Sequence, residues 1–388
     1  MTFAIEAEGL LEERRLRVLI DGDRIAAVED LGAGGGPGPR VAPGLVDLQV
    51  NGCAGLDFNA PGVDGEAVVA ATRHLWANAT TSFLPTVITG RSDRIAASMA
   101  AIAGAAASDP LIGASIPGIH LEGPFISPEN GPRGAHPAEH VRAPDWGSLQ
   151  RWQESARGMI RLITLSPEWP DAARFIERCV ESGLIVAIGH TAATGEEILE
   201  AVRAGARLST HLGNGAHPMI PRHTGYLWEQ LACDDLTASL IADGAHLPTP
   251  VLRVMLRAKG ERCLLVSDAV AATSLPPGEY VQNVGGRVLL TPDRRLVLAD
   301  DPRLLAGSVR LLPEAVSHLV AEGLTTRARA WEMASVRPAS LLGGEAALRA
   351  GAAADLVLLD WDGAAVRPRR VLKSGVDVLP AEAAGAAG

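Results

Sequence analysis

The chain has 388 residues, of which 47% are hydrophobic and 21% are charged, a composition typical of a globular protein with one large core and a smaller second domain. Its formal net charge of −10, without a run of basic residues, argues against nucleic acid as its main partner. No apolar stretch reaches membrane-spanning length and the N-terminus lacks the features of a signal peptide, so we expect a cytoplasmic protein that binds no membrane.

The first 44 residues are predicted to form strands rather than helices. Residues 17–28 alternate in a hairpin-like pattern, with Asp21-Gly22 as a turn signal. A glycine- and proline-rich loop follows at residues 32–39. This segment is too short to bury a core by itself.

From residue 45 onwards, short runs of Val, Ile, Leu and Thr alternate with alanine-rich segments of helical period. Eight runs are predicted strands, at residues 45–50, 80–88, 116–121, 159–165, 185–188, 207–210, 238–242 and 263–267. Helices are predicted at residues 64–77, 93–107, 171–182, 195–204, 248–257 and 313–321. This alternation predicts an α/β fold, a (β/α)8 TIM barrel.

Residues 353–378 are again strand-like. We therefore expect both chain termini to complete one small β-sandwich, with domains of residues 1–44 plus 350–388 and of residues 45–349. The alanine-rich tail at residues 381–388 is expected to be loose.

Four metal-competent or proton-transferring side chains stand just past predicted barrel strands. They are Glu122 in His120-Leu-Glu-Gly-Pro, then His190, His211 and Asp268. A single histidine at a strand end is more often structural, but the order of all four together favours a hydrolytic metal site at the face where barrel enzymes have their active sites. Neither lysine of the chain follows a strand-like run near these histidines, which argues against a bridging carbamylated lysine.

Several motifs resemble those of the N-acetylglucosamine-6-phosphate deacetylases of the amidohydrolase superfamily. The Pro43-Gly-Leu-Val-Asp opening is shared by the wider superfamily, whereas His120-Leu-Glu-Gly-Pro and the Ala-Asp-Gly-Ala-His run that ends at His246 are more specific to the deacetylases. The resemblance spans nearly the whole chain. It implies hydrolysis of N-acetylglucosamine 6-phosphate to glucosamine 6-phosphate and acetate, in a homodimer whose loops close the neighbouring site.

One departure from the wider superfamily concerns the number of metal ions. Many amidohydrolases carry a His-x-His pair at the end of the first strand, where this chain has Gln49 and Asn51. Neutral amides are poor ligands for soft or borderline divalent metal ions, so we expect one divalent ion per chain, held by Glu122, His190 and His211. Zn²⁺ fits this donor set best, and Fe²⁺ or Co²⁺ would also fit.

Asp268 is predicted to take a proton from water and deliver it to the leaving amine. His136 resembles the family histidine that donates a hydrogen bond to the developing oxyanion, although its Gly-Ala-His-Pro segment can equally be a plain turn. Arg222 is the candidate for the phosphate, with a surface ion pair as its alternative. The resemblance implies substrate contacts from Ala135, Asn214, Gly215, Arg222, Asp243, Gly244, Ala245, His246, Leu305, Ala306 and Gly307.

Three functions remain open from the sequence. The first is the deacetylation of N-acetylglucosamine 6-phosphate. The second keeps the metal and the fold but acts on N-acetylgalactosamine 6-phosphate, an unphosphorylated N-acetylhexosamine or another N-acyl amine, because fold does not determine substrate. The third, a non-enzymatic relative, is disfavoured because all four side chains of the expected metal site are present.

Overall fold

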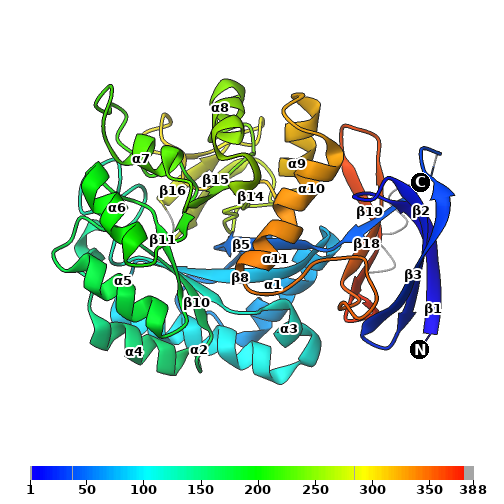
Figure 1. Ribbon diagram of the computed structural model, residues 1–388. Coiled ribbons are helices and arrows are strands. Elements are labelled where there is room, and N and C mark those ends of the chain that lie inside the picture. The colour runs from blue at the N-terminus through cyan, green and yellow to red at the C-terminus, as the bar shows by residue number, and fades with distance from the viewer. Residues whose placement is uncertain (1, 37, 284, 380–388) are drawn as a thin grey trace.

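The computed structural model describes residues 2–36, 38–283 and 285–379. Eight parallel strands form the predicted barrel sheet, in the order β14-β13-β12-β11-β10-β9-β8-β5 (Figure 1). A parallel bridge between Val50 and Ala269 joins its two ends, which closes the barrel. The strands are β5 (Leu45–Val50), β8 (Thr80–Ile88), β9 (Ile119–Glu122), β10 (Ile160–Leu165), β11 (Ile185–Ile188), β12 (Leu208–Ser209), β13 (Thr237–Leu240) and β14 (Cys263–Leu265).

The barrel strands are buried because helices cover their outer side (Figure 1). Two helices show how the sequence sets their starts: Asp64 caps α1 by accepting from the backbone N–H of Ala67, and Thr194 forms a capping box with Glu197 at α6. The helices are α1 (Gly65–Ala77), α2 (Ser92–Ser108), α3 (Pro110–Ser115), α4 (Trp146–Ser155), α5 (Ala172–Glu181), α6 (Gly195–Arg203), α7 (Tyr226–Ala232), α8 (Thr249–Lys259), α9 (Leu312–Ala321), α10 (Arg327–Ala334) and α11 (Val336–Leu341), with 3-10 turns at Ala138–His140 and Gly260–Arg262.

Strands from both chain ends form a second sheet beside the barrel, so the fold-class prediction is confirmed (Figure 1). Its order is β20-β19-β18-β4-β1-β2-β3, and β4 lies between strands from the two ends of the chain. Buried side chains of the first and last strands belong to one core, which includes Ile5, Val18, Ile25, Leu356 and Leu372. The strands are β1 (Thr2–Gly9), β2 (Arg14–Asp21), β3 (Arg24–Ala33), β4 (Arg40–Pro43), β18 (Leu356–Trp361), β19 (Val366–Lys373) and β20 (Val376–Asp377).

The predicted hairpin turn lies between β2 and β3, where Asp21 pairs with Arg24 and Gly22 has a positive φ of 60°. The boundaries 1–44, 45–349 and 350–388 stay a prediction, and the expected loose tail at residues 381–388 lies outside the described residues.

One further sheet was not predicted. It contains three antiparallel strands, β15 (Gly278–Gln282), β16 (Gly286–Leu290) and β17 (Leu296–Leu298), inserted between β14 and α9. A short two-stranded ribbon, β6 (Gly52–Cys53) with β7 (Leu56–Asp57), follows β5.

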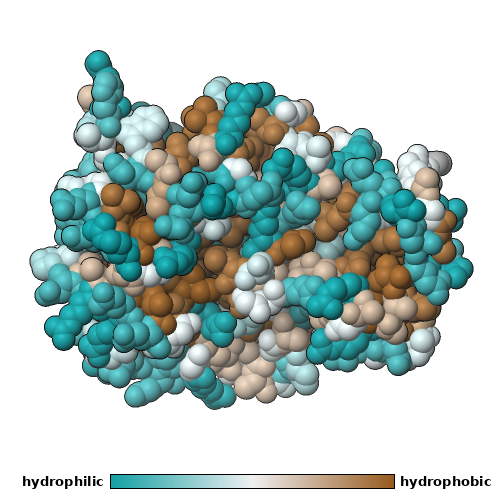
Figure 2. Space-filling view, in the orientation of Figure 1, coloured by the Kyte–Doolittle hydropathy of each residue, from teal (hydrophilic) through white to brown (hydrophobic). Residues whose placement is uncertain are grey.

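Hydrophilic residues cover most of the face shown in Figure 2, and hydrophobic ones show mainly between the helices. Within the described residues, none of the helices is both long and apolar enough to cross a membrane. The two lysines lie away from the predicted metal ligands: Lys259 donates to the backbone carbonyls of Gln230 and Cys233, and Lys373 pairs with Asp355.

Candidate metal centre and active site

The four predicted side chains lie at the carboxyl ends of their barrel strands. Glu122 is the last residue of β9, and His190 and His211 each follow two residues after the end of a strand, β11 and β12. Asp268 lies three residues beyond β14. Glu122 and both histidines are buried, whereas Asp268 is partly exposed. The structure therefore places the four residues on one face of the barrel, as their order along the chain predicts.

Three donor atoms form a tight triangle. His211 Nε2 is 3.0 Å from Glu122 Oε1 and 3.1 Å from His190 Nε2, and His190 Nε2 is 3.3 Å from Glu122 Oε1. With metal–donor bonds of about 2.0–2.1 Å, the donors of a tetrahedral site lie about 3.3 Å apart. The triangle thus fits a single divalent ion, with one further position open to water.

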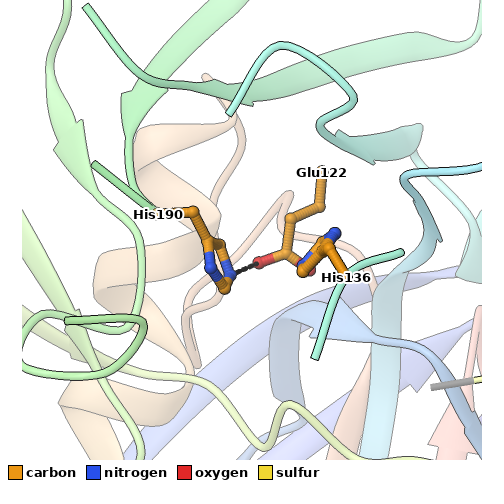
Figure 3. A group of neighbouring side chains, drawn as sticks. All are labelled: Glu122, His136 and His190. Atoms are coloured by element: carbon orange, nitrogen blue, oxygen red, sulfur yellow. Dashed lines mark ion pairs between the residues drawn. The ribbon is translucent and has the colours of Figure 1, made fainter. Parts of the chain in front are cut away.

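His136 lies beside Glu122 and His190 (Figure 3). One donor atom each from Glu122, His136 and His190 fall within 4.8 Å of one another. Burial lowers the pKa of His136 to about 3, so its ring is neutral at pH 7. Its Nδ1 is 2.9 Å from the Thr89 hydroxyl, which leaves Nε2 for the site. If Nδ1 accepts from Thr89, Nε2 carries the proton and can donate to an oxyanion; in the other tautomer, Nε2 can bind a metal.

The tautomer of His190 follows from its partner. Nδ1 of His190 is 2.8 Å from the backbone carbonyl of Pro132, which can only accept, so Nδ1 carries the proton and the lone pair lies on Nε2. The ring fits closely because residue 215 is glycine: a Cβ there would lie 2.6 Å from His190 Nδ1. Gly215 also has a positive φ of 56°. The local chain thus orients His190 as a metal-binding histidine requires.

Three of the four residues have left-handed backbone conformations, which are rare for residues other than glycine. The φ angles are 49° at His190, 30° at His211 and 50° at Asp268. Such conformations cost on the order of 1–3 kcal/mol each and are held by surrounding contacts. Here, His211 N–H donates to Ser239 Oγ and Asp268 N–H donates to the carbonyl of Gln49.

The charges of the centre are strongly coupled. Burial would raise the pKa of Glu122, but its hydrogen bonds and charge interactions with His190 and His211 outweigh burial and hold that pKa well below its usual value. Burial would lower the pKa of His211, yet its contact with Glu122 gives a net increase. The pKa of Asp268 is raised to about 6, by burial first and then by the charge of Glu122. A bound cation would oppose this increase.

The predicted substrate-contact residues surround this centre in part. Ser308 N–H donates to the Asp268 carbonyl, so the segment that directly follows Leu305, Ala306 and Gly307 lies beside Asp268. Asn214 donates to the carbonyl of His211 through its side chain, at 3.1 Å.

The loop from Asp243 to His246 is closed by its own contacts. Asp243 Oδ1 accepts from the backbone N–H groups of Ala245 and His246, and Oδ2 is 2.7 Å from His246 Nδ1. Gly244 lies over the His318 ring, where a Cβ would be 2.9 Å from Cε1. These contacts of the Asp243 carboxylate orient His246, and a substrate contact of either residue stays a prediction.

Arg222 is exposed on the loop before α7, which projects at the upper left of Figure 1, and its contact with a substrate stays a prediction. A cavity of about 300 Å³ lies beside Thr89, the partner of His136, and it includes two other arginines. Its lining includes Asn59, Ile88, Thr89, Arg91, Arg94, Pro137, His140 and Asn283.

Some residues of the centre were missed from the sequence. Thr89 directly follows β8, so the rule that polar residues at strand ends gather at one face could have found it. The role of the Pro132 carbonyl could not have been predicted, because every residue has a backbone carbonyl and the residue type does not indicate which one accepts a hydrogen bond. Gln49 and Asn51 were considered only as poor metal ligands, although both donate hydrogen bonds within the centre.

Comparison with known proteins agrees with this geometry. Residues 40–378 match the model of the amidohydrolase family. The chain belongs to the amidohydrolase family. It is therefore a hydrolase, and the family predicted from its motifs is confirmed.

Named members of this family are similar over most of their length. The N-acetylglucosamine-6-phosphate deacetylase of Bacillus subtilis is 33% identical over 280 residues, which are 71% of this chain and 69% of that one. The protein of the same name from Bos taurus is 34% identical over 333 residues, 82% and 79% of the two chains. A solved structure of a mutant N-acetyl-D-glucosamine-6-phosphate deacetylase from Mycobacterium smegmatis, in complex with N-acetyl-D-glucosamine-6-phosphate, has a TM-score of 0.86 at 30% identity and covers 98% and 100% of the two chains.

Proposed function

We propose that this amidohydrolase converts N-acetylglucosamine 6-phosphate to glucosamine 6-phosphate and acetate, with one divalent ion held by Glu122, His190 and His211. The observation that carries the proposal is the donor triangle with sides of 3.0, 3.1 and 3.3 Å, joined through Gln49 to the Asp268 carboxylate. The substrate is supported by the names of relatives that share about a third of their residues with this chain.

The chain's own groups divide the work of amide hydrolysis. When bound, a divalent ion supplies a water of lowered pKa and polarises the substrate carbonyl. Asp268 accepts a proton from the attacking water through the carboxylate oxygen that faces the site, and then delivers it to the leaving nitrogen, because an amine leaves poorly unless it is protonated. His136 donates from Nε2 to the oxygen that becomes negative, in the tautomer whose Nδ1 accepts from Thr89.

The phosphate has two candidate holders in the structure. Arg222 is supported by the family resemblance, but it is exposed and lies on the projecting loop. Arg94 lines the cavity beside Thr89, together with Arg91 and His140. Arg91 already pairs with Asp93 at 3.1 Å, so Arg94 is the stronger rival. A guanidinium at either place can bind two phosphate oxygens at once.

Zinc as the ion, a homodimer as the assembly and the cytoplasm as the location remain parts of this proposal. Zinc is supported by the two nitrogens and one oxygen of the triangle. The dimer rests on the family resemblance, and the cytoplasmic location on the sequence prediction.

The test is acetate release from matched substrates, measured on protein whose metal content is assayed in the same preparation. We expect turnover of N-acetylglucosamine 6-phosphate to exceed that of its unphosphorylated form and of the galactose epimer, and to disappear with a chelator and return with Zn²⁺. A preference for the unphosphorylated sugar would replace the proposal with the alternative, a deacetylase of neutral N-acetylhexosamines. The exposure of Arg222 fits either substrate, because the resemblance implies a homodimer in which a loop of one subunit closes the neighbouring site.

A further inference from the structure

Two neutral amides occupy the end of the first barrel strand and face the carboxylates of the centre. Gln49 Nε2 donates to Glu122 Oε1 at 2.8 Å and to Asp268 Oδ1 at 3.0 Å. Asn51 Nδ2 donates to the same Asp268 Oδ1 at 2.7 Å. Gln49 and Asn51 are both buried, at 1% and 3% exposure. Asp268 Oδ1 therefore accepts two amide donors.

The hydrogen-bond partners determine which end of each amide, the NH2 or the oxygen, faces Asp268. An ionised carboxylate can only accept, so the NH2 end of each amide must face it. For Asn51 this orientation leaves its own Oδ1 buried without a hydrogen-bond partner among the described residues. A buried acceptor without a partner costs free energy, and the opposite orientation would place two oxygens against each other. The contact with Asp268 thus outweighs the loss at Asn51 Oδ1.

The backbone reinforces this arrangement. Asp268 N–H donates to the Gln49 carbonyl at 3.0 Å, and Asn51 N–H donates to the Ala269 carbonyl at 2.7 Å. Gln49 lies on β5 and Asn51 follows the last residue of that strand, and both side chains reach the same carboxylate oxygen. Closure of the barrel therefore sets both amides against one oxygen of Asp268 and leaves Oδ2 without a hydrogen bond from the described residues.

We propose that Gln49 and Asn51 are positioning residues for proton transfer. Asn51 fixes the rotamer of Asp268 so that Oδ2 faces the reacting water and the leaving nitrogen. Gln49 does the same and also links Asp268 to Glu122, because its two amide hydrogens are shared between the two carboxylates. The Gln49 amide thus stabilises the two neighbouring carboxylates, Glu122 and Asp268, by donating a hydrogen bond to each. This inference rests on the proposed function, since it assigns Asp268 the proton transfer.

The two amides differ in a way that a variant pair can separate. Among the described residues, the side-chain amide of Asn51 donates only to Asp268, whereas that of Gln49 also donates to Glu122, a predicted metal ligand. Asn51→Leu should keep the metal, with an unchanged rate of loss to a chelator, and should lower kcat about ten- to a hundredfold with little change in KM. Gln49→Leu should lower kcat as well, and should also speed metal loss to the chelator.

The pH profile supplies a readout that a merely structural role would not move. Donors to an ionised carboxylate lower its pKa, so Asn51→Leu should shift the acidic limb of kcat/KM to higher pH. Asn51→Asp keeps the shape of the side chain but sets a second carboxyl against Asp268, and should shift the limb further in the same direction. Should the leucine variant fail to fold, the aspartate variant still tests the proposal.

The matched control is Asn78→Leu. Asn78 follows α1, outside the metal centre and the cavity beside Thr89, and its side chain donates to the backbone carbonyl of His74 at 2.9 Å. This variant should lower thermal stability without moving the acidic limb. The proposal is overturned if Asn51→Leu, with intact metal, keeps wild-type kcat and acidic limb, or if it loses metal as readily as Gln49→Leu. A wild-type protein that releases no acetate from N-acetylglucosamine 6-phosphate would refute the proposed function instead, and the chelator comparison would still report on the two amides.

Discussion

Replacing Asp268 by asparagine should separate chemistry from metal binding. In Asp268→Asn the new amide can keep its carbonyl oxygen at the position of Oδ1, where it still accepts from Gln49 and Asn51 at 3.0 and 2.7 Å in the parent structure. Its NH2 then occupies the place of Oδ2. The variant keeps its local hydrogen bonds but presents a donor where the reaction needs a proton acceptor.

The expected loss follows from the missing proton transfer. General acid–base catalysis contributes roughly 10²- to 10⁴-fold, so kcat should fall at least about a hundredfold, equivalent to about 3 kcal/mol. Because Asp268 lies outside the donor triangle, metal content should stay at the wild-type value. The assay is the initial rate of acetate release at saturating substrate, with elemental analysis and a thermal midpoint on the same sample.

The matched control is Asp47→Asn. This variant removes a different carboxylate, that of the buried Asp47 on β5. Asp47 Oδ1 accepts from the backbone N–H groups of Gln49 and Ser267 and has no part in the proposed chemistry. This variant should retain most of the turnover. Near-normal turnover in Asp268→Asn, or loss of its metal, would refute the proton-transfer role.

Three further predictions concern metal, phosphate and stability. Elemental analysis should find about one divalent ion per chain, and His190→Ala should lose metal and activity together; two stoichiometric ions would contradict the single donor triangle. Arg222→Ala should lower kcat/KM on the phosphorylated sugar about ten- to a hundredfold and barely change residual activity on the unphosphorylated one. If Arg94→Ala shows this pattern instead, the phosphate binds in the cavity beside Thr89. Burial raises the pKa of Asp47 to about 7, so the contribution of this carboxyl to stability is fully present below about pH 4 and is lost as the pH rises through 7, by at most about 4 kcal/mol; the difference in unfolding free energy between wild type and Asp47→Asn, from denaturant titrations at several pH values, should follow this fall.

The barrel could be predicted because each strand is a short buried run bounded by turn signals. The predicted bounds of β5, β8 and β11 agree with the structure, and β12 is shorter than expected, at Leu208–Ser209. The β15–β17 sheet was missed because its strands are short and only partly buried, with a small core around Val288 and Leu296. Such strands lack the continuous hydrophobic run that identifies a buried one.

That the predicted ligands lie together could be inferred from the sequence because the carboxyl ends of barrel strands meet at one face, whatever the conformation of the loops. The groups that orient them could not. The Pro132 carbonyl reaches His190 through the path of a loop, and the contact of Asn51 with Asp268 depends on closure between the first and last barrel strands. The sequence shows which residue types could bind a metal, whereas the hydrogen-bond partner of each of these side chains depends on the whole fold.

The terminal sheet has a consequence for the order of synthesis. Ala42 on β4 pairs with Val357 on β18, so the fourth strand must wait for a neighbour made roughly 300 residues later. At about 5–20 residues per second, that wait is roughly 15 to 60 seconds, during which the first three strands have no completed core. The barrel can assemble in this interval, but the sheet beside it cannot be completed until β18, β19 and β20 have been synthesised. The strand edges of residues 2–43 therefore stay unpaired for longest during synthesis, and a factor that binds exposed strand edges would have to stay bound there for this time.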